Sequence, residues 1–172
     1  MEEDGDALPQ VRSFCITLST MPDSENPDSK VLFRVMDTDG SDYVETLWAF
    51  HLADDNYQLA NSPFYAYSVS WEDIIVAPFN TDEGFPTFQR VASKSGNRTV
   101  RVFFESAGNE SETILQGLVH LGCSYEGANE KYFSINIPPG IDLESIRTYL
   151  IDQHATWEHA DPSYTELFPD QK

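Results

Sequence analysis

The spacing of the apolar residues changes partway along the chain, and this change constrains the fold more than any other feature of the sequence. Before Glu105, apolar residues occur in short runs that alternate with polar residues or end at turn residues, which is typical of β-strands. After Glu105 they recur at helical spacing, first as Ile114, Leu115, Leu118 and Leu121. The sequence therefore predicts an α+β protein whose first half is rich in strands.

Between residues 30 and 104 the sequence predicts six short strands. They are Lys30–Asp37, Tyr43–Ala53, Tyr57–Leu59, Ile74–Phe79, Phe85–Ala92 and Thr99–Phe104. The first three follow one another through polar turns and are expected to form a meander. The last two are expected to pair across the Gly-Asn turn at residues 96 and 97. This density of strands indicates a small antiparallel β-barrel or a strongly curved sheet.

The second half mixes helices with strands. After Thr99–Phe104 comes a helical run that starts near Asn109, and then a hairpin of Cys123–Glu126 and Tyr132–Ile137. A second helix follows Asp142, whose side chain is suited to cap it. The order β-α-β-β-α supplies five of the six elements of a ferredoxin-like unit, so we expect a ferredoxin-like half.

These patterns divide the chain into four parts. Residues 1–29 are expected to be an acidic flexible segment, 30–97 an antiparallel β lobe, 98–155 a ferredoxin-like α+β lobe, and 156–172 an acidic C-terminal tail. The aromatic residues Trp157, Tyr164 and Phe168 are expected to dock this tail on the body of the protein. The two lobes are either independent domains or share a core, since Thr99–Phe104 is able to serve both.

The charge balance restricts the possible partners. The chain has 10 Lys and Arg against 29 Asp and Glu, which gives a formal net charge of −19. Such a chain is repelled by nucleic-acid backbones and by anionic membrane surfaces, and it is attracted to basic surfaces. We therefore expect no direct binding to nucleic acid or membranes. The alternative is that the charge serves solubility alone.

Cysteine usage and the N-terminus indicate a cytoplasmic protein. Two cysteines, Cys15 and Cys123, are too few for a disulfide scaffold, and each lies in an apolar run. The first six residues are acidic, unlike the basic start of a signal peptide. No apolar stretch approaches the ~20 residues that cross a bilayer. The sequence does not determine the oligomeric state.

No catalytic or metal-binding motif stands out, so we predict no enzyme, cofactor or metal. A nucleophile elbow and the glycine-rich phosphate and dinucleotide loops are absent from the sequence. The run Asp37–Asp42 fails as a calcium loop, because Gly40 stands in the fourth place and Trp48 in the twelfth. The group around His154 and His159 lacks the spacing of a zinc site and is interpreted as histidines near a helix end.

The segment Asn61–Asp73 is the most distinctive candidate for binding, because it concentrates aromatic residues beside acids. Such a mixture is suited to hold Arg and Lys side chains by stacking and ion pairing. The residues that we expect at a partner are Asp54, Asp55, Tyr65, Tyr67, Trp71, Glu72, Asp73, Asp82 and Glu83. The alternative is that the aromatic residues close one end of a barrel.

Four basic residues lie close together in this otherwise acidic sequence. Arg90, Lys94, Arg98 and Arg101 lie within twelve residues. If the strands around them pair, some of these side chains lie on adjacent strands and are able to hold an anion. The alternative is that they pair with carboxylates on neighbouring strands and protect a sheet edge.

Several blocks resemble a bacterial family of uncharacterised proteins that is known as a domain of unknown function. The first is Lys30–Asp37 followed by Val44-Glu45-Thr46-Leu47-Trp48-Ala49. The others are Asn61-x-Pro63-Phe64-Tyr65-Ala66-Tyr67-x-Val69-Ser70-x-x-Asp73 and Thr99-Val100-Arg101-Val102. The similarity spans about residues 30–150. It implies a bacterial cytosolic protein, and small acidic proteins of this kind look like immunity proteins.

The leading hypothesis is an immunity or antitoxin-like protein whose acidic surface covers a basic toxin, such as one that acts on nucleic acid. The acids would steer the encounter, and Tyr65, Tyr67 and Trp71 would anchor the complex. The alternative hypothesis is a regulatory module that binds a small anionic ligand. It would use the basic cluster Arg90, Lys94, Arg98 and Arg101 together with the ferredoxin-like half.

Overall fold

The structure of the protein is a computed structural model that describes residues 26–36 and 42–170. The predicted acidic segment up to residue 25, with Cys15, lies outside the described residues. So do residues 37–41, which make up most of the stretch that was compared with a calcium loop.

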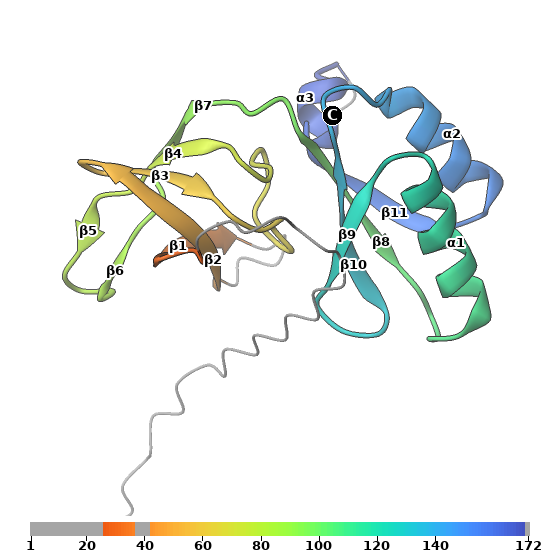
Figure 1. Ribbon diagram of the computed structural model, residues 1–172, viewed down its shortest axis with the longest axis horizontal. Helices are drawn as coiled ribbons and strands as arrows, with labels where there is room; N and C mark the ends of the chain where they lie inside the picture. Colours follow the sequence, from red (N-terminus) through yellow and green to blue (C-terminus); the bar gives the residue numbers. More distant parts are fainter. Residues whose placement is uncertain (1–25, 37–41, 171–172) are drawn as a thin grey trace, which may run out of the picture.

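The described residues form an α+β arrangement with mostly antiparallel strands, which confirms the predicted class (Figure 1). The strands of the first half are β1 (Ser29–Met36), β2 (Asp42–Ala53), β3 (Asn56–Leu59), β4 (Ile74–Val76), β5 (Phe79–Asn80), β6 (Phe85–Pro86) and β7 (Arg90–Ser93). The second half contains β8 (Arg98–Phe103), α1 (Asn109–His120), β9 (Ser124–Gly127), β10 (Tyr132–Ile137), α2 (Leu143–Asp152), β11 (Thr156–Asp161) and α3 (Tyr164–Leu167).

The first half is a five-stranded antiparallel sheet in the order β1-β2-β3-β4-β7. The predicted meander is present as β1 to β3. The sheet curves strongly, because Leu32 of β1 forms a parallel bridge with Thr87, just before β7, and accepts a 2.8 Å hydrogen bond from the N–H of Phe88. Among the described residues this bridge alone joins the two ends, so of the two predicted forms the barrel is wrong and the curved sheet is found. Its apolar core includes Phe33 and Leu47.

The predicted hairpin between Phe85–Ala92 and Thr99–Phe104 is also wrong. The first of these runs is split into β6 and β7, and β7 pairs with β4. β8 belongs to the other sheet. The connection between them is held away from a hairpin by its polar side chains, since both Ser95 and Asn97 donate hydrogen bonds to the Trp71 carbonyl.

The second half is a four-stranded antiparallel sheet in the order β11-β8-β10-β9. Helices α1 and α2 cover one face of it (Figure 1). Val100, Val102, Ile135 and Ile137 point to this face, and they pack with apolar residues of both helices. Alternation along β8 and β10 therefore leaves a polar opposite face.

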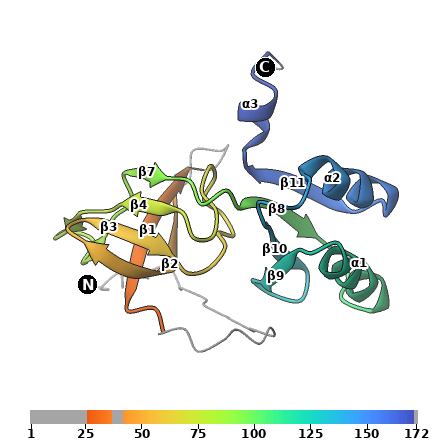
Figure 2. The same ribbon diagram turned by 45° about the horizontal axis from the view of Figure 1, so that its top comes forward.

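The segment from Thr156, which the sequence analysis treats as a tail, begins with an edge strand of this sheet. β11 pairs with β8, and Trp157 packs against the apolar core under the helices. Figure 2 shows α3 beyond the end of β11, at the C-terminal end of the described chain. Backbone pairing and this one aromatic side chain outweigh the acidic composition that indicated a tail.

The polar face of the second sheet packs against the connecting segment Asn61–Asp73 of the first half. We call this contact the seam. Three side chains of the sheet donate to three carbonyl groups of the segment. They are Ser134 to Pro63 at 2.8 Å, Tyr132 to Phe64 at 2.5 Å, and Arg101 to Ala66. All three bonds cross the seam, so they fix the second half against the segment.

Three consecutive N–H groups of the same segment are held by the first half. Glu45 of β2 is buried, and its carboxylate accepts from Phe64 at 2.6 Å, Tyr65 at 3.0 Å and Ala66 at 2.8 Å. Burial raises the pKa of Glu45, while the three N–H groups and then Arg101 act in the opposite direction. Residues 63–66 are thus bonded to the first half through N–H groups and to the second half through carbonyl groups.

We predict that Glu45→Gln destabilises the fold. Oε1 of Glu45 serves Phe64 and Oε2 serves Tyr65 and Ala66, but a glutamine has only one accepting oxygen. At least one buried N–H group therefore loses its acceptor, which costs about 1–3 kcal/mol. The free energy of unfolding from urea titration measures this loss. Glu112→Gln, an exposed change on α1, is the control, and equal stability of the two variants would contradict the role of Glu45.

A second buried carboxylate gives the stability of the seam a pH dependence. Glu126 of β9 accepts the Ser62 N–H at 2.9 Å. Burial, and then the nearby Glu45, raise the pKa of Glu126 from 4.5 to about 7. The folded protein therefore holds this proton more tightly than the unfolded chain does. The contribution of Glu126 to stability falls as the pH rises from 4.5 to about 7.

We predict that Glu126→Gln stabilises the protein at alkaline pH. The amide stays neutral and still accepts the Ser62 N–H through its oxygen. Its advantage in unfolding free energy over the wild type should grow from under about 1 kcal/mol at about pH 5 to about 3 kcal/mol at about pH 8. Urea titrations across this range measure the difference. A constant difference would show that Glu126 does not titrate in this window.

Candidate functional site

The most prominent surface feature near the seam is a row of four aromatic rings. Tyr43 stacks with Tyr65 at a centroid distance of 6.4 Å, Tyr65 lies 5.9 Å from Tyr132, and Tyr132 lies 6.5 Å from Phe103. Tyr43, Tyr65 and Phe103 are 48, 49 and 47% exposed. We call these four residues the aromatic row.

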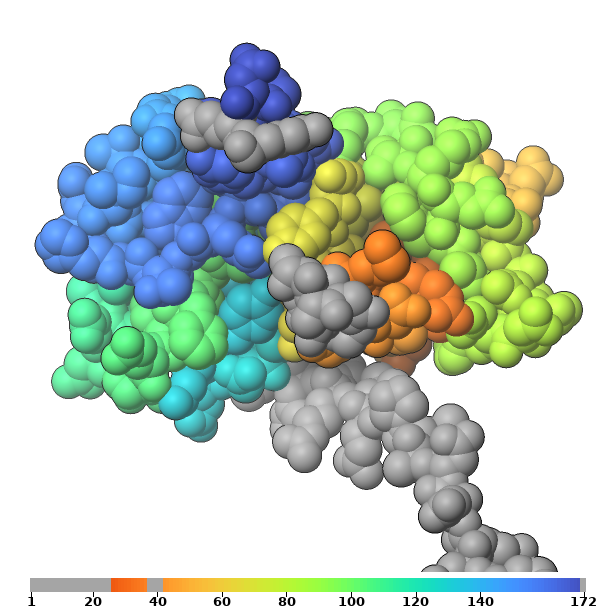
Figure 3. Space-filling view, turned by 180° about the vertical axis from the view of Figure 1, so that it is seen from behind, coloured from red at the N-terminus to blue at the C-terminus, as the bar shows by residue number. Residues whose placement is uncertain are grey.

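Four separate parts of the chain supply the aromatic row. Tyr43 lies near the start of β2, Tyr65 lies in the segment that Glu45 holds, and Phe103 and Tyr132 face each other in the register of β8 and β10. The row therefore extends from the first half to the second. Figure 3 shows the segment around residues 60–70, in yellow, between the two halves.

Tyr67 of the connecting segment and Glu158 of β11 form a polar contact between the two halves. The Tyr67 hydroxyl donates to Oε2 of Glu158 at 2.9 Å, and Arg101 contacts the other oxygen at 3.0 Å. The Arg101 guanidinium also lies 4.5 Å from the centre of the Tyr67 ring. Burial, followed by the hydrogen bond to Glu158, raises the pKa of Tyr67, so the phenol is neutral at physiological pH.

The predicted partner residues of the segment fall into different environments. Tyr65 and Tyr67 are exposed at the seam, and Trp71 is half-buried. Glu72 is exposed and accepts from Asn97. Asp73 is fully buried, so its predicted role as a partner contact is corrected to a structural one.

Asp73 anchors the connection that leads to β8. Its carboxylate accepts the N–H groups of Ser70 at 2.9 Å and Ser95 at 2.8 Å. It also accepts from the Lys94 ammonium at 3.1 Å, and Lys94 binds Asp161 at 2.8 Å. A buried carboxylate with these donors has no free lone pair directed at a partner.

The other predicted acids lie in two turns of the first half. Asp54 and Asp55 form the β2–β3 turn, and Asp82 and Glu83 lie in the β5–β6 turn. The Ala77 N–H donates to the Asp55 carbonyl at 2.8 Å, which brings the first turn beside the strand that leads into β5. Glu83 pairs with Arg34. These acids do not belong to the aromatic row.

The structure separates the four basic residues that were proposed to bind an anion. Arg90 is exposed on β7, Lys94 is bound to two carboxylates, and Arg98 donates to the Ile141 carbonyl. Arg101 is almost fully buried at the seam. The expectation of one anion site built from this cluster is therefore corrected, because β7 and β8 lie in different sheets.

Sequence reasoning missed Tyr43, Phe103 and Tyr132. A signal for Phe103 is present, because Val100, Val102 and Phe104 occupy the core, and alternation then directs Phe103 outward. No local pattern links these residues to one another. Within residues 26–36 and 42–170, no cluster of three or more His, Cys, Asp or Glu is placed to hold a metal ion. None of the helices in these ranges is long and apolar enough to cross a membrane.

Comparison with known proteins places the chain in a family. Residues 45–160 match the family described as Domain of unknown function (DUF4265). No curated protein matches the sequence. A hypothetical protein from Neisseria gonorrhoeae, known from a crystal structure, has a similar fold with a TM-score of 0.70 and 17% sequence identity, over 83% of this chain and 99% of that one. The expected resemblance to an uncharacterised domain family is confirmed, and the chain belongs to the DUF4265 family.

Proposed function

We propose that this protein is a non-catalytic binding protein that covers a basic partner protein through the aromatic row. Its mode of action would be that of an immunity or antitoxin-type protein, which occludes a toxin in the cytoplasm. The observation that carries the proposal is the continuous row of Tyr43, Tyr65, Tyr132 and Phe103 across the seam.

The aromatic row has the properties of an interface centre. Exposed aromatic side chains that lie next to one another mark interaction sites more often than isolated ones do. Tyrosine supplies a large contact area with few rotatable bonds, and it is enriched among the residues that dominate binding energies. Because Glu45 fixes the backbone of Tyr65 and the Phe64 carbonyl fixes the Tyr132 hydroxyl, little backbone order has to be gained on binding.

The charge of the chain favours a basic partner. A net charge of −19 attracts cationic proteins and increases the rate of their encounter at low salt. Asp42 precedes Tyr43 in the chain and Glu105 follows Phe103 closely, and both acids are exposed. Arg and Lys side chains of a partner are able to stack on the rings of the row and pair with such carboxylates.

The acidic turns of the first half fit a role in steering. Asp54, Asp55 and Asp82 are exposed and lie outside the aromatic row. Within this proposal they increase the rate of association and contribute little to the lifetime of the complex.

We infer that the second half is a ferredoxin-like unit. The element order β8-α1-β9-β10-α2-β11 and the sheet order β11-β8-β10-β9 support this inference. One face of its sheet is covered by helices and the other by the seam. The unit therefore offers its strand ends, where Phe103 and Tyr132 lie, to a partner.

The proposal predicts that a double change in the aromatic row abolishes partner binding. The full-length protein, immobilised, is exposed to a lysate of its own host at low and at high salt, and retained proteins are identified by mass spectrometry. The wild type should retain one basic protein at low salt and release it at high salt. Tyr43→Ser combined with Tyr65→Ser should lower its retention at least about tenfold, because two anchoring rings are lost.

Phe79→Ser is the matched control, because Phe79 is an exposed aromatic residue of β5, away from the aromatic row. This variant should retain the partner as the wild type does. Purified partner should then bind with a dissociation rate that rises in the double variant only. Equal retention by all three proteins, or no specific retention at either salt, would refute the proposed function.

A further inference from the structure

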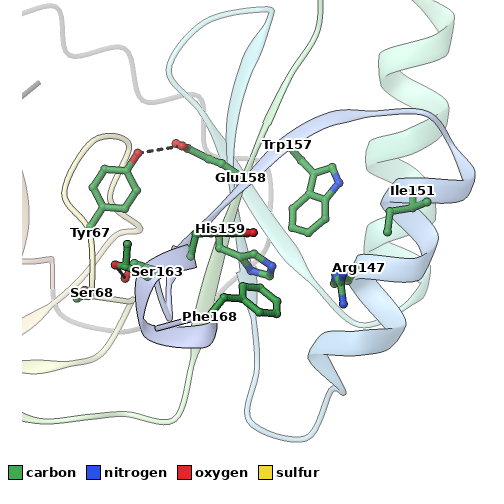
Figure 4. A pocket seen from close by; sticks show the side chains of 11 residues that line it. Tyr67, Ser68, Arg147, Ile151, Trp157, Glu158, His159, Ser163 and Phe168 are labelled. Atoms are coloured by element: carbon green, nitrogen blue, oxygen red, sulfur yellow. Dashed lines mark hydrogen bonds between the residues drawn. The ribbon is translucent and has the colours of Figure 1, made fainter. Parts of the chain in front are cut away.

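A pocket of about 920 Å³ lies in the second half, away from the aromatic row, between α2, β11 and α3 (Figure 4). Trp157 and Ile151 line one part of it, and Phe168 lines another. Arg147 of α2 and His159 of β11 also line it. The pocket thus combines flat apolar walls with a small number of polar groups, which is typical of small-molecule sites.

His159 supplies an unsatisfied polar atom in this pocket. Its side chain lies between Trp157 and Phe168 (Figure 4), with ring centroids 4.8 Å and 6.5 Å away. The residue is only 7% exposed, and its Nδ1 atom is buried without a hydrogen-bond partner. Leaving such an atom unpaired is unfavourable, and a ligand with a polar group is able to pair with it.

Arg147 supplies a positive charge whose present ion pair a ligand is able to replace. Its guanidinium contacts the two carboxylate oxygens of Glu144 at 3.1 Å and 3.3 Å, three residues earlier on the same helix. Both side chains are partly exposed, so this pair is weak and readily replaced. The guanidinium also lies 5.9 Å from the centre of the Phe168 ring. An anion bound beside Phe168 would therefore be within its reach.

Glu158, which lines the pocket, and Glu166, which lies on α3 near it, are already engaged. Glu158 is bound by Arg101 and Tyr67. Burial opposes the ionisation of Glu166, but hydrogen bonds from Ser163 and Ser68 outweigh it and lower the pKa of Glu166. Burial, and then Arg147, lower the pKa of His159, so its imidazole is neutral at physiological pH. Arg147 therefore remains the group that selects the charge of a ligand.

We propose that this pocket binds a small aromatic carboxylate. Its ring would lie against Trp157 and Phe168, its carboxylate at Arg147, and a polar atom at Nδ1 of His159. A single guanidinium matches one negative charge, whereas a phosphate carries more charge and needs more donors. The site uses none of the basic cluster Arg90, Lys94, Arg98 and Arg101, and its test does not require the proposed protein partner.

Calorimetric titration of the full-length protein with indole-3-carboxylate and benzoate tests the proposal, with indole-3-carboxamide and inorganic phosphate as comparison probes. Indole-3-carboxylate should bind saturably at one site. Its neutral amide should bind at least about tenfold more weakly, because it cannot pair with Arg147. Phosphate should not bind measurably, because it offers no ring to the apolar walls.

Two variants distinguish the contribution of the Arg147 charge to binding from the contribution of the rest of the pocket. Arg147→Gln should weaken the carboxylate at least about tenfold and leave the carboxamide unchanged. His159→Phe should weaken both probes, because it removes the polar atom and fills space. Arg90→Gln, which removes an exposed arginine from β7, is the matched control and should bind like the wild type. Circular dichroism checks that each variant is folded.

Three results would overturn the proposal. They are no saturable binding of either carboxylate to the wild type, equal affinity for carboxylate and carboxamide, and unchanged affinity in Arg147→Gln. Phosphate binding that Arg147→Gln abolishes would also overturn it, since it would identify an anion site without selection for an aromatic ring.

Discussion

The Glu45 carboxylate is the interaction on which the arrangement of the two halves depends. It receives three consecutive N–H groups of the segment Phe64–Ala66, while side chains of the second sheet donate to carbonyl groups at Pro63, Phe64 and Ala66. The peptide units Pro63–Phe64 and Phe64–Tyr65 are thus each bonded to both halves, through the N–H group to one and through the carbonyl group to the other. Because the bonds are buried and directional, they specify one orientation of the halves, which apolar packing alone would not do. The position of Tyr65 in the aromatic row is a direct consequence.

A polar seam also explains why binding groups gather where they do. The second sheet has apolar side chains toward α1 and α2 and polar ones toward the connecting segment. Arg101, in the middle of the polar face, donates hydrogen bonds to the Ala66 carbonyl and to Glu158. At the ends of β8 and β10 Phe103 reaches the surface, and Tyr132, whose hydroxyl donates to the Phe64 carbonyl, is partly exposed. The aromatic row therefore lies at one end of the seam.

Local periodicity was enough to predict most strands, the helices α1 and α2 and the α+β class, because alternation and helical spacing reflect which side chains face a core. It failed where tertiary contacts decide the outcome. Thr99, Arg101 and Phe103 alternate with the core residues of β8, a pattern that is typical of a solvent-exposed face. Thr99 and Arg101 are nevertheless buried. The sequence of β11 resembles an acidic tail, because its acids bind residues that are far away in the sequence, as Asp161 binds Lys94. Tyr65 was found from local aromatic density, whereas its neighbours in the row come from distant positions.

The aromatic row and the pocket are physically connected. Tyr67 lines the pocket and donates to Glu158, and Glu158 is bound in turn by Arg101, which contacts the segment that carries Tyr65. A ligand that displaces the Glu158 carboxylate changes the charge balance around Arg101, and a partner that moves the segment changes the hydrogen bond of Tyr67. Coupling between two binding sites is reciprocal. A ligand that lowers the affinity for the partner must therefore bind more weakly, by the same factor, when the partner is present.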